Sequence, residues 1–289
     1  MHSNYALAVN IRIADSQIFV KCSYDNRVID HKQVRRILRQ FEYFHSQLSA
    51  GLNEFDFVNP HDVEEICRWN EPISEPVEAC IHELISRQAK QRPDAEAVCA
   101  WNGRLTYREL EDFSDRLAGH LQHHLKIGTG SIIPYCFEKS VWSIVGMLAV
   151  VKAGGTITAL DPTWPSERME AILNQTKAQL ALCSSTSKLS LEKMGCTAIV
   201  VDADLIDQLQ SPQEPLGPTH AKDVLFIQYT SGSTGQPKGI LITHENWATS
   251  LAGHAEPLGF DSSTRAIQFC NFTYDVSMGE IFSTLCMVR

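Results

Sequence analysis

The most informative stretch of the sequence is Tyr229-Thr230-Ser231-Gly232-Ser233-Thr234-Gly235-Gln236-Pro237-Lys238-Gly239. Its three glycines let the backbone adopt positive φ angles and approach an anion closely. Successive N–H groups in such a turn form an anion-binding nest. Further donors and one positive charge come from Thr230, Ser231, Ser233, Thr234 and Lys238. This composition predicts a loop that holds a chain of phosphates.

Two other interpretations of this stretch fit it less well. A Gly/Ser/Thr run is also typical of a flexible linker, but this run lies between two apolar runs, 224–227 and 240–242, that read as buried strands. A Walker A loop needs Gly-Lys followed by Ser or Thr at the start of a helix. Here Lys238 lies between Pro237 and Gly239, so we predict a phosphate loop of another kind.

Composition limits the partners of the chain. Its 289 residues suffice for one large domain or two smaller ones. The net charge of −9, from 25 basic and 34 acidic residues, argues against a nucleic-acid or anionic-membrane partner. The longest apolar run, 141–151, is too short to span a membrane. Nine scattered cysteines without a Cys-x-x-Cys pair, and no signal-peptide pattern at the N-terminus, lead us to expect free thiols in the cytoplasm.

The first 60 residues read as a small α+β piece. Alternating apolar residues predict strands within 5–24, and helical spacing predicts an amphipathic helix over 31–49 with Asp30 as its N-cap. Two strands and one helix cannot bury their own apolar face. We therefore interpret 1–60 as the end of another domain.

A linker and an α/β domain follow. Prolines, asparagines and acidic residues make 61–76 a linker with one short helix at 62–69. From residue 77 onward, strands alternate with helices, which implies a largely parallel α/β sheet over 77–289. The expected helices are 77–91, 107–125, 141–152 and 166–176, and the expected strands are 97–101, 131–137, 156–160 and 180–184.

The stretch at 229–239 resembles the phosphate-binding signature of the adenylate-forming superfamily, which contains acyl-CoA synthetases, luciferases and the adenylation domains of nonribosomal peptide synthetases. Three further segments, 105–110, 151–168 and 272–282, resemble motifs of this family in the family's order. In the first of them, Thr106 and Glu109 have the spacing of a helix capping box. In the second, Gly154-Gly155 is typical of a left-handed helix cap. We assign structural roles to both.

The segment 272–282 resembles a motif that distinguishes subfamilies, with Tyr274 where the family usually has Phe. In amino-acid-activating members, the aspartate at the position of Asp275 pairs with the substrate's α-ammonium group. Such a pair is needed because an unpaired buried charge is very costly. By the same resemblance Val276 and Gly279 line the side-chain pocket. The alternative role for Asp275 is that of a helix N-cap.

The resemblance also implies the reaction and the co-substrates. In this family a carboxylate attacks the α-phosphorus of ATP, which forms an acyl-adenylate and releases pyrophosphate. The resemblance implies that the ATP phosphates are held by Thr230, Ser231, Gly232, Ser233, Thr234, Gly235 and Lys238. Mg²⁺ would lie nearby, and we assign it no ligand. His244 matches a histidine that is common after the phosphate loop, and we expect it at the nucleotide site.

The upstream residues favour one subfamily. The stretch 19–25 and the helix that follows it resemble the tail of a condensation domain, and Trp69-Asn70 resembles the start of a condensation-to-adenylation linker. This order favours a nonribosomal peptide synthetase of secondary metabolism. The implied partners are an amino-acid substrate and the condensation and carrier domains of a parent synthetase. Phosphopantetheine would belong to a carrier domain that is not present in these residues.

The sequence ends at Arg289, and three family features are absent from it: the adenine-binding Asn-x-Tyr-Gly-Pro-Thr-Glu, the ribose-binding aspartate and the lysine of the C-terminal domain. We therefore assign no catalytic residue and expect an incomplete adenylate-forming N-terminal domain, preceded by a small condensation-domain remnant. The expected activity is ATP-dependent amino-acid activation. The alternatives are a truncated remnant without catalysis and an acyl- or aryl-acid-activating ligase.

Overall fold

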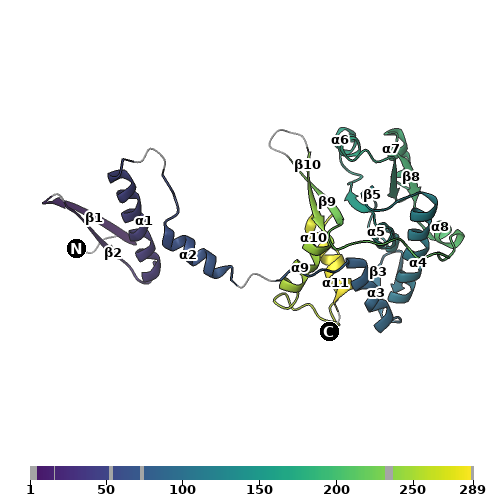
Figure 1. Cartoon of the computed structure of the whole chain (residues 1–289), viewed down its shortest axis with the longest axis horizontal. Helices are drawn as coiled ribbons and strands as arrows, with labels where there is room; N and C mark the ends of the chain where they lie inside the picture. Colours follow the sequence, from purple (N-terminus) through teal and green to yellow (C-terminus); the bar gives the residue numbers. More distant parts are fainter. Residues whose placement is uncertain (1–4, 16, 52–54, 72–74, 232–236, 288–289) are drawn as a thin grey trace. The chain divides into compact units, whose positions relative to one another are not determined.

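The computed structural model describes residues 5–15, 17–51, 55–71, 75–231 and 237–287. It divides into two compact units, Met1–Ile73 and Ser74–Arg289 (Figure 1). The division falls within the predicted linker 61–76. Among the described residues, no helix combines the length and the apolar character needed to cross a membrane.

The N-terminal unit contains two strands and two helices, as its sequence pattern predicts. Strands β1 (Leu7–Ala14) and β2 (Gln17–Tyr24) pair antiparallel. Helix α1 (His31–Ser49) begins after Asp30, whose side chain accepts a hydrogen bond from the N–H of Lys32. Helix α2 (Pro60–Trp69) occupies the position of the short helix expected in the linker.

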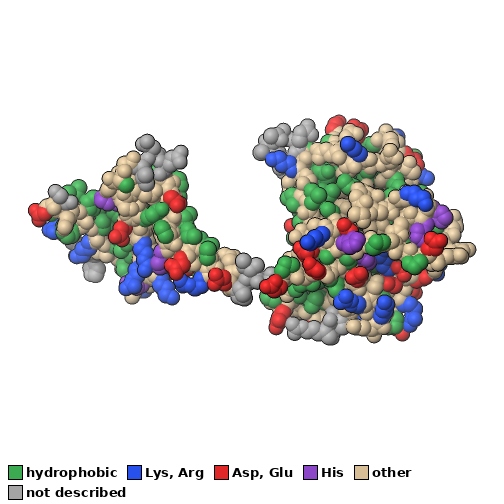
Figure 2. Space-filling model, in the orientation of Figure 1, with side chains coloured by type: hydrophobic (Ala, Val, Ile, Leu, Met, Phe, Trp, Pro, Cys, Tyr) green, Lys and Arg blue, Asp and Glu red, His purple; other side chains and the backbone are tan. Residues whose placement is uncertain are grey.

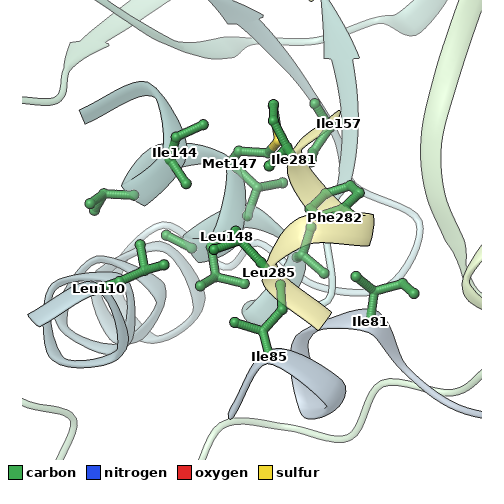
Figure 3. Close-up of a cluster of buried hydrophobic side chains, with 14 of the residues drawn as sticks. Ile81, Ile85, Leu110, Ile144, Met147, Leu148, Ile157, Ile281, Phe282 and Leu285 are labelled. Carbon is green, nitrogen blue, oxygen red and sulfur yellow. The ribbon is translucent and has the colours of Figure 1, made fainter. Parts of the chain in front are cut away.

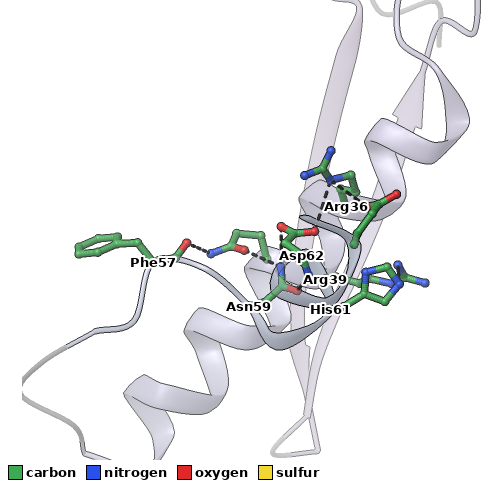
Figure 4. A network of polar contacts seen from close by, with 8 residues as sticks. Arg36, Arg39, Phe57, Asn59, His61 and Asp62 are labelled. Atoms are coloured by element: carbon green, nitrogen blue, oxygen red, sulfur yellow. Dashed lines mark hydrogen bonds and ion pairs between the residues drawn. The ribbon is translucent and has the colours of Figure 1, made fainter. Parts of the chain in front are cut away.

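Polar contacts join α2 to α1 (Figure 4). The buried Asn59 caps α2 by accepting the N–H of Asp62 at 3.0 Å, and its amide donates to Gln40 of α1 at 2.7 Å. Arg39 of α1 lies 2.7 Å from the Nε2 atom of His61. These contacts order α2 although none of its residues is buried.

The two strands leave apolar side chains in contact with solvent. Ile11 and Ile13 are 55% and 75% exposed, and Phe19 is 45% exposed. Figure 2 shows hydrophobic side chains among the charged ones on the viewed surface of this unit. The unit therefore does not bury its own apolar face. Its assignment to a condensation domain stays a prediction.

The C-terminal unit is built on a six-stranded sheet with the order β10-β9-β6-β5-β7-β8. The five strands from β9 to β8 are parallel, and β10 is antiparallel to β9. This confirms the expected largely parallel α/β sheet. The strands are β5 (Ile132–Cys136), β6 (Thr156–Ala159), β7 (Leu180–Cys183), β8 (Thr197–Val200), β9 (Val224–Ser231) and β10 (Pro237–Thr243), with a separate pair β3 (Glu96–Ala100) and β4 (Gly103–Thr106).

The helices of this unit match the expected ones closely at most positions. They are α3 (Ile81–Gln91), α4 (Tyr107–Gly119), α5 (Val141–Lys152), α6 (Ser166–Thr176), α7 (Lys188–Lys193), α8 (Ala203–Gln208), α9 (His244–His254), α10 (Asp275–Met278) and α11 (Thr284–Cys286), with π-helical turns at His120–His124 and Gly279–Ser283. The capping box of Thr106 and Glu109 is present at the start of α4. Gly154 has a φ of 80° after α5, so the left-handed cap is confirmed.

Two local predictions are wrong. The run 240–242 was expected to be a buried strand, but β10 is the outer strand of the sheet, and Ile240 and Leu241 are 48% and 59% exposed. An edge strand has a neighbour on one side alone and is less covered. Helix α3 begins at Ile81 rather than at residue 77, and the N–H of Ile81 in its first turn donates to Nδ1 of His244.

The core lies between the sheet and its helices (Figure 3). Every residue of α5 except Trp142 is buried. Met147 and Leu148 of α5 belong to the same buried cluster as Phe282 and Leu285 from the C-terminal end of the described chain. A helix that is apolar on all sides is typical of the centre of a large core.

Candidate functional site

The predicted phosphate stretch joins two adjacent strands of the sheet. Strand β9 ends at Ser231 and β10 begins at Pro237, and the two antiparallel strands form a β-hairpin. Both strands extend beyond the predicted runs 224–227 and 240–242 into the stretch that was expected to be a loop. It starts at the carboxyl end of β9, on the same edge as the carboxyl ends of the parallel strands β5 and β6. Ligands of open α/β sheets bind at that edge. Gly232, Ser233, Thr234 and Gly235 lie outside the described residues.

Thr230 and Lys238 are the predicted phosphate ligands whose side chains the structure describes. They are cross-strand partners, and the hydroxyl of Thr230 donates to the carbonyl of Lys238 at 3.5 Å. Both residues are exposed at the base of the hairpin. A side chain at Gly239 would meet the side chain of Ile227 at 2.9 Å, so the close pairing of the strands requires glycine here. The hairpin therefore presents a hydroxyl and an ammonium group beside the predicted loop.

The segment that contains Asp275 contacts the same edge of the sheet. The amide of Asn271 donates to the carboxylate of Asp161, which follows β6, at 2.6 Å. The amide of Gln228, on β9, donates to the carbonyl of Thr273. Gln228 and Thr273 are 45 residues apart in the sequence, so this hydrogen bond brings the two motifs together in the fold.

Asp275 is the first residue of α10 and is exposed. Its Oδ1 atom accepts a hydrogen bond from the N–H of Val276 at 2.8 Å. The N-cap position belongs to Tyr274, so the alternative role of Asp275 as an N-cap is wrong. Its other carboxylate oxygen, Oδ2, accepts no hydrogen bond from the residues that the structure describes and is available at the surface.

The two predicted pocket residues lie close to Asp275. Val276 is 56% exposed. A Cβ atom at Gly279 would lie 3.9 Å from the indole of Trp247, which is ordinary van der Waals distance. The surface beside Asp275 therefore carries one exposed apolar side chain, and a glycine whose Cβ position is in van der Waals contact with an aromatic ring. Their role as a substrate pocket stays a prediction.

His244 lies in the protein interior. It is 1% exposed, and its Nδ1 atom accepts a hydrogen bond from the N–H of Ile81 at 3.1 Å. Its ring packs edge-on against that of His82, with 5.7 Å between the centroids. Burial, and then the neighbouring His82, lower the pKa of His244 to about 4, so the ring is neutral. These contacts give His244 a structural role between α9 and α3, and its place at the nucleotide site stays a prediction.

Two groups of side chains have the composition of metal sites. Ligand atoms of Cys80, His82 and His244 lie within 4.8 Å of one another. The Nδ1 atom of His244 already accepts the N–H of Ile81, which places the ring proton on its other nitrogen. A metal ion would have to displace this bond or reverse the tautomer.

The second group belongs to the N-terminal unit and consists of His61, Asp62 and Glu65. Arg39 contacts His61, and Arg36 lies 3.3 Å from Asp62 (Figure 4). Two cations thus occupy the positions from which a metal ion would be bound. We assign no metal to either group, and no Mg²⁺ ligand among the described residues.

The sequence interpretation missed three contact residues at the sheet edge: Lys139, Asp161 and Gln228. Lys139 follows β5, and its ammonium group donates to the carbonyls of Gln268 and Phe269. A signal for the first two existed, since Asp161 directly follows a predicted strand and Lys139 lies two residues beyond another. Gln228 had no such signal because it lies within a strand.

A family model described as AMP-binding enzyme matches residues 85–287. The chain is 38% identical over 288 residues to the nonribosomal peptide synthetase GRA1 of Gibberella zeae, covering 98% of this chain and 4% of that protein. It is 36% identical over 288 residues to the N-benzoylphenylalaninol synthetase apmA of Penicillium brevicompactum, covering 98% of this chain and 12% of that protein. The chain thus spans a small part of the length of these curated relatives.

Solved structures show the same fold. The AMPPNP-bound nonribosomal peptide synthetase FmoA3 is matched with a TM-score of 0.74 at 22% identity, over 98% of this chain and 31% of that one. The N-terminal subdomain of Klebsiella oxytoca NpsA, in complex with 3-hydroxyanthranilyl-AMSN, is matched with a TM-score of 0.63 at 23% identity, over 74% of this chain and 54% of that one.

Proposed function

Because this chain belongs to the AMP-binding enzyme family, we propose that it forms the ATP- and amino-acid-binding part of an adenylation module in a nonribosomal peptide synthetase. In the proposed reaction a carboxylate oxygen of the amino acid attacks the α-phosphorus of ATP. The bond between that phosphorus and the pyrophosphate oxygen breaks, and an aminoacyl-adenylate forms. The observation that carries the proposal is the contact of the Asp275 segment with β9, the strand that leads into the predicted phosphate loop.

ATP binding is supported by the hairpin and by the comparisons. Thr230 and Lys238 lie side by side at the base of the loop, and Lys238 offers a positive charge to phosphate oxygens. The hydroxyl of Thr230 would turn from the carbonyl of Lys238 to donate to a phosphate oxygen. The matched FmoA3 structure is an AMPPNP-bound form, and AMPPNP is an analogue of ATP. Mg²⁺, when bound together with ATP, would neutralise part of the phosphate charge. Lys238 would supply the protein's share of this neutralisation.

The amino acid is the proposed second substrate because of Asp275. Its carboxylate is exposed at the start of α10, where it can meet an ammonium group. An ion pair in water contributes about 0–1 kcal/mol, so the surface position alone gives weak binding. The pair becomes strong once the substrate and neighbouring protein exclude water from it. We infer that the parent synthetase covers this site.

The parent enzyme would supply the remaining parts of the cycle. A carrier domain with phosphopantetheine would accept the aminoacyl group, and a condensation domain would form the peptide bond. The assignment of 1–60 to such a condensation domain rests on the resemblance of 19–25 and on the likeness to peptide synthetases over 98% of the chain. A cytoplasmic location fits this role.

Amino-acid-dependent exchange of pyrophosphate into ATP tests the proposal. We expect exchange with one or a few amino acids, and a fall of about 100-fold or more in Asp275→Ala, since removing one partner of a desolvated charge pair costs several kcal/mol. The matched control is Asp204→Ala, which removes an exposed aspartate of α8. Unchanged exchange in Asp275→Ala would reject its role as the ammonium partner.

The same assay separates the alternatives. Exchange that depends on an aryl acid instead of an amino acid would favour an aryl-acid-activating ligase, for which the bound 3-hydroxyanthranilyl compound of NpsA is a precedent. Absence of exchange with every carboxylic acid would favour a chain that is inactive by itself.

A further inference from the structure

We propose that three side chains at the carboxyl edge of the sheet, Lys139, Asp161 and Gln228, position the amino-acid site by holding the segment 268–274. We call them the clamp residues. Each comes from a different strand or strand end: β5, β6 and β9. The inference rests on the proposed function, because it gives these residues a purpose in placing Asp275 relative to the phosphate loop.

Asp161 makes the central contact of the clamp. Its Oδ1 atom accepts hydrogen bonds from the N–H and the hydroxyl of Thr163, at 2.8 and 2.7 Å, which fix the turn after β6. Its Oδ2 atom accepts the side-chain amide of Asn271 at 2.6 Å. Both oxygens of the carboxylate are thus used, one for its own turn and one for the distant segment.

Asn271 carries this contact on toward Asp275. Its Oδ1 atom accepts the N–H and the hydroxyl of Thr273, each at 3.0 Å. Its carbonyl accepts the N–H of Tyr274, also at 3.0 Å. Hydrogen bonds therefore connect Asp161 to Asn271 and Asn271 to Tyr274, the residue before Asp275. A shift of Asn271 would move the start of α10.

Gln228 and Lys139 hold the segment on both sides of Asn271. Gln228 lies on β9, three residues before the strand ends at Ser231, and its side chain donates to the carbonyl of Thr273. Lys139 donates to the carbonyls of Gln268 and Phe269 at 2.8 and 2.5 Å. Hydrogen bonds from a charged donor are stronger than those between neutral groups.

The clamp explains how an irregular segment can hold a substrate group. Residues 265–274 form neither helix nor strand, so no backbone ladder fixes them to the sheet. The side chains of the clamp replace that ladder. Because a misplacement of about 1 Å lowers the rate of a positioned reaction by about 100-fold, we expect the reaction to be sensitive to this contact.

A reversal of donor and acceptor tests the clamp. Asn271→Asp places a carboxylate against that of Asp161, and we expect the KM for the amino acid to rise about tenfold or more, while the KM for ATP stays within about twofold. The double variant Asp161→Asn/Asn271→Asp lets an amide donate to a carboxylate in the opposite direction. It also keeps acceptors for Thr163 and Thr273. We expect it to recover most of the lost affinity.

The control is Lys188→Ala, which removes a surface lysine of α7 and leaves both KM values unchanged. The proposal is overturned if the double variant is as impaired as Asn271→Asp, or if the KM for ATP rises as much as that for the amino acid.

A second readout separates the clamp from the proposed function. Hydrogen–deuterium exchange of the amides around 273–277 is measured in the intact chain without substrates. We expect faster exchange in Asn271→Asp and recovery in the double variant. If the unaltered chain activates no carboxylic acid, it is inactive by itself and gives no KM values, but the exchange of these amides still tests the clamp. Equal exchange in all three proteins would refute the clamp.

Discussion

Lys152 offers the sharpest test of the packing in the C-terminal unit. Its side chain is 3% exposed, and its ammonium lies 2.7 Å from Asp115 and 2.8 Å from Glu111, both on α4. Lys152→Met keeps the length of the side chain and removes the charge. Loss of one partner from a buried ion pair costs about 3–5 kcal/mol. We expect about 3 kcal/mol, because the two carboxylates are 39% and 24% exposed and stay partly hydrated.

Urea unfolding of the intact chain measures this loss, and pH provides an internal check. Burial raises the pKa of Asp115, while Lys152 opposes the rise. Without Lys152 the folded-state pKa of Asp115 rises further above its unfolded value. A raised folded pKa favours the protonated folded state, so the deficit of the variant should shrink as the pH falls through that pKa.

Two results would refute this reasoning. If Lys152→Met lowers the free energy of unfolding by less than about 1 kcal/mol, the loss is that of an exposed ion pair. The site would then be open to water. A deficit that does not change with pH would mean that lost packing, and not unpaired charge, causes it. The triple variant Lys152→Met/Glu111→Gln/Asp115→Asn should recover much of the loss, because it leaves no charge unpaired.

Three further outcomes are expected from urea unfolding. Gly239→Ala should lose about 1–3 kcal/mol through overpacking between strands, whereas Gly253→Ala, where a Cβ meets nothing within 4 Å, should gain about 0.5–1 kcal/mol from helix propensity. The pKa values of His82 and His244 are both lowered to about 4 by burial. As the pH falls below 6.5, these histidines become protonated in the unfolded chain but stay neutral in the folded protein until about pH 4. The free energy of unfolding should therefore be highest above pH 6.5 and decrease toward pH 4. His82→Gln should make this decrease smaller. Thr106→Ala should cost about 1 kcal/mol through the lost helix cap; a cost near zero would show that the cap does not stabilise α4.

The sequence predicted best those features that depend on neighbouring residues. The capping box at Thr106 and the left-handed Gly154 each follow from a pattern of a few residues, and the structure has both. The bounds of α5 and α6 were also predicted, because the residues that mark them, the apolar run of α5 and those that flank each helix, are neighbours in the sequence.

The features that were missed depend on contacts between distant parts of the chain. The N–H of Ile81 at the start of α3 donates to His244, 163 residues away, and Asn271 donates to Asp161 across 110 residues. The exposure of β10 follows from its place at the end of the strand order, which no local pattern reveals. The candidate site was therefore recognised by its motifs, while the side chains that support it required the fold.

The burial of α5 on nearly all sides has a consequence for the order of folding. Its apolar surface is covered from several directions, including by Phe282 and Leu285, which are synthesised more than 120 residues after Leu148 (Figure 3). Contacts between such distant residues form slowly, because a long loop must close before they are made. During translation α5 therefore stays partly uncovered until residues near 285 have left the ribosome. Over that interval, binding by a chaperone would protect the helix from aggregation.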